Sequence, residues 1–222
     1  MAKKQPQMGK CCLCSGEFDR AQMHKHLISC IENKTPTKAS GKGTKTFHIL
    51  VQGYGFADYW LIVEAKASAK LDNLDGFLRD IWLECCGHLS SFKIDGMDYD
   101  VHPDESIESE SMDFRLDDVL EVGTKFSHIY DFGTSTELSL KVLSEQQRKD
   151  VKKPLTLLAR NNPPEAPCQK CGQPAIEVCT DCLWSGRMPF LCKKCAKSHD
   201  CPDEMFLPVV NSPRMGVCGY EG

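Results

Sequence analysis

Apolar residues between positions 47 and 160 are distributed as expected for a mixed domain of several strands and one main helix. Short apolar runs bounded by turn residues are typical of strands. Such runs stand at 47–52, 59–65, 92–94, 97–99, 126–132, 137–143 and 155–159. Leu71, Leu74, Leu78, Ile81 and Cys85 recur at steps of three or four residues, which is the helical period. The pattern predicts an α+β fold with a mostly antiparallel sheet and one main helix.

Polar and proline-rich stretches mark the expected domain boundaries. Residues 31–46 are polar and basic, as in flexible linkers, and the NNPPEAP stretch at 161–167 favours an extended chain. The charged residues 144–153 are expected to be helical or solvated. The predicted segments are a cysteine/histidine unit at 1–31, a basic linker at 32–46, an α+β domain at 47–160, a Pro-rich linker at 161–167, a cysteine-rich module at 168–203 and a tail at 204–222.

The net charge of −4 hides a strong asymmetry along the chain. Residues 1–46 carry nine basic and three acidic side chains, residues 47–150 carry nine and twenty-one, and residues 151–222 carry nine and seven. The acidic middle segment repels a phosphate backbone, so it is a poor nucleic-acid surface. We expect it to face a protein partner, a basic one, and leave residues 1–46 as the candidate for nucleic-acid contact.

A compact set of metal-binding side chains stands near the start of the chain: Cys11, Cys14, His26 and Cys30. Zinc takes four nitrogen or sulfur ligands in a tetrahedron, and His26 and Cys30 are four residues apart, which places them on one face of a helix. The unit resembles a C2H2-type zinc finger whose last histidine is a cysteine, a C2HC-like finger with a central spacer one residue shorter. Two alternatives stay open, Cys12 in place of Cys11 and His24 in place of His26.

A second cysteine-rich unit holds eight further ligands: Cys168, Cys171, Cys179, Cys182, Cys192, Cys195, His199 and Cys201. Eight ligands fill two tetrahedral sites. The order resembles the cross-brace fingers of the HIT, MYND and B-box kinds. That resemblance implies one ion on Cys168, Cys171, Cys192 and Cys195, and a second on Cys179, Cys182, His199 and Cys201. A sequential pairing of 168–182 and 192–201 stays open, as does Cys218 as a substitute ligand for the last pair.

These units together predict about three Zn²⁺ ions per chain, each in a closed structural site. Ten of the fourteen cysteines lie in them. No export signal or apolar run of the roughly 20 residues that cross a bilayer is visible. Because reducing cytosol keeps thiols free, metal binding explains the cysteines better than disulfides do. We expect a cytoplasmic protein without a membrane partner.

The middle segment carries motifs of a known family. They are Tyr59-Trp60, the amphipathic stretch 71–82, Gly87-His88-Leu89 followed by Phe92, and Tyr130-Asp131-Phe132-Gly133. With these motifs, residues 47–143 resemble the plasmid-ORF-like family, also called the TnpR-like passenger proteins of insertion elements. After Gly133 the family continues with an acid, an aromatic residue and a Glu-His pair, where this chain has residues 134–138 as Thr-Ser-Thr-Glu-Leu. The resemblance implies the fold rather than recombinase chemistry.

Three functions follow as expectations from these features. The favoured one is a non-enzymatic zinc-binding adaptor that mediates protein–protein interaction through the acidic domain and the zinc fingers. The first alternative is a nucleic-acid-associated regulatory factor that uses residues 1–46. The second is an enzyme with a site near His88 and Asp131, to which His128 is a further polar candidate; no nucleophile or phosphate-binding motif accompanies them.

Overall fold

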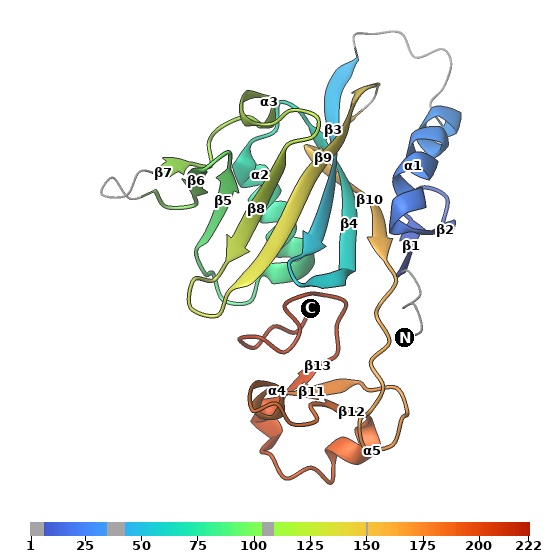
Figure 1. Ribbon diagram of the computed structural model, residues 1–222, viewed down its shortest axis with the longest axis vertical. Coiled ribbons are helices and arrows are strands. Elements are labelled where there is room, and N and C mark those ends of the chain that lie inside the picture. Colours follow the sequence, from blue (N-terminus) through green and yellow to red (C-terminus); the bar gives the residue numbers. More distant parts are fainter. Residues whose placement is uncertain (1–6, 35–42, 104–108, 150) are drawn as a thin grey trace. The chain divides into compact units, whose positions relative to one another are not determined.

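The computed structural model describes residues 7–34, 43–103, 109–149 and 151–222 and divides the chain into two compact units (Figure 1). The first unit contains Met1–Leu78 and Leu89–Asn162, and the second contains Arg79–His88 and Pro163–Gly222. The division therefore differs from the sequence-based boundaries, because a short internal segment joins the C-terminal residues.

A large sheet forms the first unit. In the described residues it has ten strands in the order β2-β1-β10-β4-β3-β9-β8-β5-β6-β7, and every neighbouring pair is antiparallel except β6 and β7. The strands are β1 (Met8–Cys11), β2 (Glu17–Asp19), β3 (Thr44–Gly53), β4 (Phe56–Lys66), β5 (Ser90–Ile94), β6 (Met97–Asp100), β7 (Ser109–Ser111), β8 (Lys125–Tyr130), β9 (Thr136–Arg148) and β10 (Leu155–Asn161). The predicted α+β class with a mostly antiparallel sheet is confirmed.

The helices are more varied than the apolar pattern predicts. The longest is α1 (Arg20–Lys34), which belongs to the N-terminal cysteine/histidine unit. The predicted main helix begins as α2 (Leu71–Leu78) and continues as a π-helical turn, η1 (Arg79–Leu83). A short helix, α3 (Leu116–Val119), precedes β8. No helix in the described residues combines the length and the apolar character needed to cross a bilayer.

Strand β4 is covered on both faces, which explains its continuous apolar run. Every residue from 59 to 65 is buried. Met23 and Leu27 of α1 pack in one cluster with Trp60 and Ile62 of β4. Because side chains alternate along a strand, residues 61 and 63 point to the opposite face, on which α2 lies in Figure 1.

The N-terminal cysteine/histidine unit is part of this sheet rather than a separate appendage. Gly9 of β1 lies opposite Asn161 of β10, and β1 also pairs with β2. A Cβ atom added at Gly9 would lie 2.4 Å from the Trp60 ring, so the packing of this ring against β1 requires glycine there. The unit consequently shares the hydrophobic core of the domain.

Two segments expected outside the sheet extend it instead. Residues 44–46, assigned above to the linker, begin β3. Residues 144–148 continue β9, and residues 146–148 lie directly opposite 44–46. At the other end of the expected linker, residues 32–34 complete α1, while residues 35–42 lie outside the described residues. The backbone N–H and C=O groups of each strand end pair with those of the other. The polar side chains of these segments do not reveal such pairing.

The extension also places a carboxylate inside the sheet. Glu64 of β4 is 4% exposed, and Arg148 Nε donates to its Oε1 at 2.7 Å. His48 Nε2 lies 3.9 Å from the same oxygen. Burial by itself raises the pKa of Glu64, but the contacts with His48 and Arg148 outweigh it and lower the pKa.

We expect Arg148→Met to lower the free energy of unfolding by about 2 kcal/mol near neutral pH. Removing one partner of a fully buried pair costs about 3–5 kcal/mol, and the Arg148 side chain is 20% exposed. A lowered carboxylate pKa stabilises the fold above the unfolded value of about 4.3, and that stabilisation disappears as pH falls through the folded value. The difference between wild type and variant should therefore shrink toward pH 3.

Urea unfolding at several pH values measures this difference directly. Arg115→Met is the matched control, because Arg115 pairs with Asp117 while about half of its own side chain is exposed. Such a pair contributes at most about 1 kcal/mol. Equal effects of the two substitutions at neutral pH would contradict the role assigned to Glu64.

The second unit contains little regular structure. A three-stranded antiparallel sheet has the order β12-β11-β13. Its elements are β11 (Glu177–Cys179), α4 (Thr180–Trp184), β12 (Phe190–Leu191), α5 (Lys193–Ala196), the 3-10 turn η2 (Asp203–Met205) and β13 (Phe206–Pro208). Part of the expected tail at 204–222 is thus a strand of this sheet.

The inserted segment Arg79–His88 is bound to the C-terminal residues of the same unit. The Trp82 indole N–H donates to the Asn211 carbonyl at 3.0 Å, and the Ser212 hydroxyl donates to the Trp82 carbonyl at 2.7 Å. Trp82 and Leu83 are fully buried. These contacts explain why residues 79–88 group with the C-terminal residues.

Candidate metal centres and an acidic hollow

Cysteine and histidine side chains gather in four groups of four within the described residues. In each group the potential ligand atoms all lie within 4.8 Å of one another. The groups are Cys11, Cys14, His26 and Cys30; Cys85, Cys86, His88 and Cys218; Cys168, Cys171, Cys192 and Cys195; and Cys179, Cys182, His199 and Cys201. All fourteen cysteines are free of disulfides, and thirteen belong to these groups, with Cys12 as the exception.

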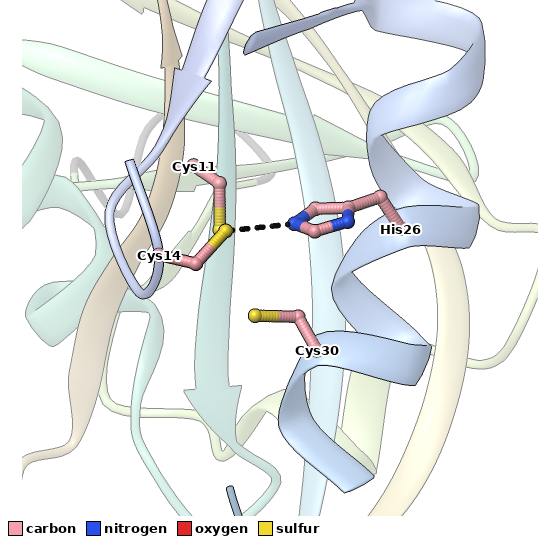
Figure 2. Close-up of side chains that lie close together, drawn as sticks. All are labelled: Cys11, Cys14, His26 and Cys30. Carbon is pink, nitrogen blue, oxygen red and sulfur yellow. Dashed lines mark hydrogen bonds between the residues drawn. The ribbon is translucent and has the colours of Figure 1, made fainter. Parts of the chain in front are cut away.

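The N-terminal group joins β1 and its following turn to α1. Figure 2 shows His26 and Cys30 projecting from α1 toward Cys11 and Cys14. His26 Nε2 lies 3.2 Å from Cys14 Sγ. The Phe18 ring stacks on His26 with centroids 4.0 Å apart, which holds the imidazole in place.

The two alternative ligands point elsewhere. Cys12 lies outside the group. His24 Nε2 lies 3.0 Å from the Ser144 hydroxyl, on the side of the sheet. Within the group, the Gly16 N–H bonds to Cys14 Sγ at 3.4 Å, and this bond is the main cause of the lowered pKa of the Cys14 thiol.

The third group holds four thiols on two C-x2-C turns. Cys171 Sγ lies 3.6 Å from both Cys192 Sγ and Cys195 Sγ. Burial by itself raises the pKa of the Cys168 thiol, but backbone N–H groups of Cys192, residue 170 and Cys171 outweigh it and lower the pKa to about 6. At Cys168 these N–H groups therefore favour the thiolate, which is the form that binds metal.

The fourth group interleaves with the third along the chain. Cys179 ends β11 and Cys182 lies in α4, while His199 and Cys201 follow α5. Cys182 Sγ lies 3.2 Å from His199 Nε2 and 3.9 Å from Cys201 Sγ. The structure thus brings the residues together in the interleaved order rather than the sequential one, and the short spacing between His199 and Cys201 lets both reach the group.

The second group was not predicted from the sequence. The sequence pattern places Cys85 on a helix face and offers His88 as a candidate catalytic residue and Cys218 as a substitute ligand for the C-terminal module. The structure places all three with Cys86. Cys86 and Cys218 are 132 positions apart, so no local spacing marks the group. The available signal was a Cys-Cys-x-His string and one remaining cysteine near the C-terminus.

The distances within the groups fit a tetrahedral ion. Two sulfurs that are each about 2.3 Å from zinc lie about 3.8 Å apart, and a sulfur and a nitrogen lie about 3.6 Å apart. Sulfur–sulfur distances of 3.6–3.9 Å match the first value, while the sulfur–nitrogen distances of 2.9–3.2 Å are somewhat shorter. A disulfide needs about 2.05 Å. All four groups are therefore compatible with zinc.

Each of the three polar residues that the sequence offers for catalysis takes part in a turn, a buried pair or a cysteine/histidine group. Asp131 has φ 67°, and its Oδ1 accepts the N–H groups of Gly133 and Thr134 at 3.0 and 3.1 Å, as in a turn. His128 is fully buried, with Nε2 2.7 Å from Asp75 Oδ1. His88 belongs to the second cysteine/histidine group.

A separate feature of the first unit is an acidic hollow of about 440 Å³. It lies between the β5–β6 hairpin and the segment from α3 to β8. Its apolar lining is Ile94, Met97, Tyr99, Val119 and Leu120, and its acidic lining is Asp95, Asp117, Asp118 and Glu121.

The charges around the hollow are only partly neutralised. Arg115 donates to both carboxylate oxygens of Asp117 at 2.9 Å. Among the described residues, Asp118 and Glu121 have no ion pair. Burial raises the pKa of Tyr99, and the negative charges of Glu110 and Asp95 raise it further. The hollow is therefore electronegative.

Residues 51–174 match the family described as "Plasmid pRiA4b ORF-3-like protein", which is more than half of the chain. The match confirms the plasmid-ORF part of the resemblance and does not reach the TnpR-like name. No curated protein matches the chain. A crystal structure of a protein of unknown function from Methanosarcina mazei Go1 is similar, with 18% identity and a TM-score of 0.45; the match covers 51% of this chain and 69% of that one.

Proposed function

The chain belongs to the family of plasmid pRiA4b ORF-3-like proteins, and we propose that it is a non-enzymatic zinc-binding adaptor that binds a basic segment of a partner protein in the acidic hollow. The hollow is the observation that carries this proposal. It combines an apolar base with unpaired carboxylates at its rim, and this chemistry suits a lysine or arginine side chain.

The fit follows from the shape of a basic side chain. Lysine and arginine lay their methylene stems along apolar surface and keep the charged head among polar groups. Here Tyr99 and Leu120 offer the apolar surface, since both are buried at the base. Asp118 and Glu121 are exposed and offer the carboxylates. A tyrosine ring also attracts a cation through its π-face.

Zinc has a structural role in this proposal. A catalytic zinc keeps an open position for water or substrate, whereas the groups here each supply four protein ligands. The N-terminal group acts as a C2HC-like finger, and residues 168–203 act as a cross-brace module similar to HIT, MYND and B-box fingers. Thirteen thiols arranged as ligand groups also suit a reducing compartment such as the cytoplasm.

We expect Asp118→Asn combined with Glu121→Gln to weaken binding of a labelled lysine- and arginine-rich peptide by about tenfold. Two exposed ion pairs contribute up to about 1 kcal/mol each, and 1.4 kcal/mol is tenfold in affinity. Fluorescence anisotropy at about 0.01 M and 0.15 M salt measures the effect. Binding to the wild type should weaken at the higher salt because the screening length falls from about 30 to 8 Å.

The matched control is Glu17→Gln combined with Glu137→Gln. It removes the same charge from exposed positions on β2 and β9, and β2 is at the opposite edge of the sheet from β6. Equal weakening by both double variants would show that net charge alone attracts the peptide and would sink the assignment of the hollow. Binding of a DNA duplex that the hollow variant leaves unchanged would favour the nucleic-acid-associated alternative for residues 1–46.

A further inference from the structure

We infer that Cys85, Cys86, His88 and Cys218 form a fourth zinc site, which joins the internal segment 85–88 to the C-terminal turn. This site goes beyond the three zinc sites that the sequence predicts and beyond the adaptor role proposed above. All four residues belong to the second unit.

The three sulfur atoms and the imidazole nitrogen of this group surround a single point. Cys86 Sγ lies 2.9 Å from His88 Nε2 and 3.8 Å from Cys218 Sγ. His88 Nε2 lies 3.2 Å from Cys218 Sγ, and Cys85 Sγ lies 3.6 Å from Cys86 Sγ. The sulfur–sulfur distances agree with the roughly 3.8 Å of two thiolates on one zinc. Three sulfurs and one imidazole nitrogen are also a ligand set that zinc uses in structural sites.

The backbone on both sides is shaped to present these ligands. Gly87, between two of them, has φ 74°, and its N–H donates to Glu84 Oε1 at 2.6 Å. Arg79 fastens the same turn, because its guanidinium donates to Glu84 at 2.8 Å and to the His88 carbonyl at 2.7 Å. Cys218 has φ 49°, a conformation that a cysteine adopts only when its surroundings require it.

A buried arginine lies beside the group and carries a charge opposite to that of the zinc-bound thiolates. Three thiolates and one Zn²⁺ carry a net charge of −1. Arg214 is fully buried, and its Nη2 lies 3.4 Å from Cys85 Sγ. A buried charge is costly unless an opposite charge compensates it. The metal-bound thiolates would place a net negative charge beside the Arg214 guanidinium, whereas a group of neutral thiols would not.

The site has a clear structural consequence. It links residues 130 positions apart within one unit, beside the hydrogen bonds that already join Trp82 to Asn211 and Ser212. The residues that follow β13 form no further strand. Bound zinc would therefore hold the C-terminal turn against the inserted segment.

Metal content per chain tests the inference. Zinc-loaded wild-type protein should contain about four equivalents, because closed four-ligand sites fill stoichiometrically. Cys86→Ser and Cys218→Ser should each contain about three. Cys12→Ser is the matched control and should keep four, since Cys12 is the exposed cysteine outside the groups. Three equivalents in the wild type, unchanged in Cys218→Ser, would overturn the fourth site and leave the other three intact.

Thiol alkylation of the wild-type protein provides a readout that does not depend on a variant folding. In the zinc-loaded chain, peptide mapping should show Cys86 and Cys218 reacting at least about tenfold more slowly than Cys12, and equally fast after chelation, because metal-bound thiolates are protected. Rapid alkylation of Cys86 and Cys218 in the loaded protein, or a disulfide between them that chelation leaves unchanged, would overturn the inference. Absence of any zinc would instead refute the zinc-binding function itself.

Discussion

Cys179→Ser should unfold the segment 163–222 at ordinary temperature and release at least one zinc ion per chain. Cys179 is fully buried at the end of β11, the central strand of the small sheet. Beyond its cysteines, this segment has only three fully or nearly fully buried hydrophobic residues, namely Val178, Leu191 and Tyr220. Structural zinc contributes about 10–16 kcal/mol in small finger peptides, as much as the whole stability of a typical domain.

Limited proteolysis followed by mass mapping measures this unfolding, and metal analysis measures the lost zinc. Cleavage should concentrate between residues 163 and 222, while the sheet of the first unit stays resistant. A Cys179→Ser chain whose C-terminal residues resist protease as well as the wild type would refute a structural role for this metal group.

Cys14→Ser is the informative comparison, because it removes a ligand from a group whose helix is also held by hydrophobic packing. The helix α1 that carries His26 and Cys30 is also packed through Met23 and Leu27 on the core of the large sheet. We therefore expect this chain to lose one zinc equivalent but to keep α1 attached and the first unit protease-resistant. The two Cys→Ser variants together distinguish a segment that needs its metal to fold from a unit that stays folded when its metal is lost.

Asp75→Leu should lower the free energy of unfolding of the first unit by about 3–5 kcal/mol. Asp75 of α2 is 3% exposed, and His128 of β8, 2.7 Å away, is fully buried. Removing one partner of a buried hydrogen-bonded pair leaves the other without compensation for its lost hydration. The Phe92 ring, 4.6 Å from the His128 ring, keeps that side of the histidine apolar.

Urea unfolding of the single and double variants tests this prediction. Adding His128→Leu to Asp75→Leu should recover much of the lost stability, because two apolar side chains can replace a buried polar pair at little net cost. Asp113→Ala is the control, since Asp113 bonds to Lys70 on the exposed surface and should cost less than about 1 kcal/mol. A double variant less stable than the single one would show that the imidazole has a partner that matters more than Asp75.

The sequence predicted the features that depend on interactions between residues close together in the chain. The expected strands at 92–94 and 97–99 form the β5–β6 hairpin, whose two-residue turn Asp95-Gly96 has the positive φ at both positions that such a turn needs. The C-x2-C pairs were readable from spacing, since such a turn brings two sulfurs to one point whatever the rest of the fold does. The division of the eight C-terminal ligands into two groups followed only from the resemblance to cross-brace fingers, and the structure groups them in that order. The helical period at 71–78 was equally readable.

Features that depend on distant partners were not predicted. The strand character of residues 44–46 and 146–148 arises because each segment pairs with the other. The attachment of the N-terminal unit depends on β1 meeting β10, with Gly9 against Trp60. Polar side chains conceal such strands, because backbone hydrogen bonds rather than an apolar face hold them in the sheet.

The sequence by itself determined that this is an α+β protein with metal-ligand spacing at both ends and an acidic middle. Only the tertiary structure decided that the first cysteine/histidine unit belongs to the large sheet, that Asp118 and Glu121 border one hollow, and that Cys86 meets Cys218. The physical reason is the range of each interaction. Turn geometry and helical period act over a few residues, whereas a site assembled from positions 86 and 218 exists only after the chain has folded.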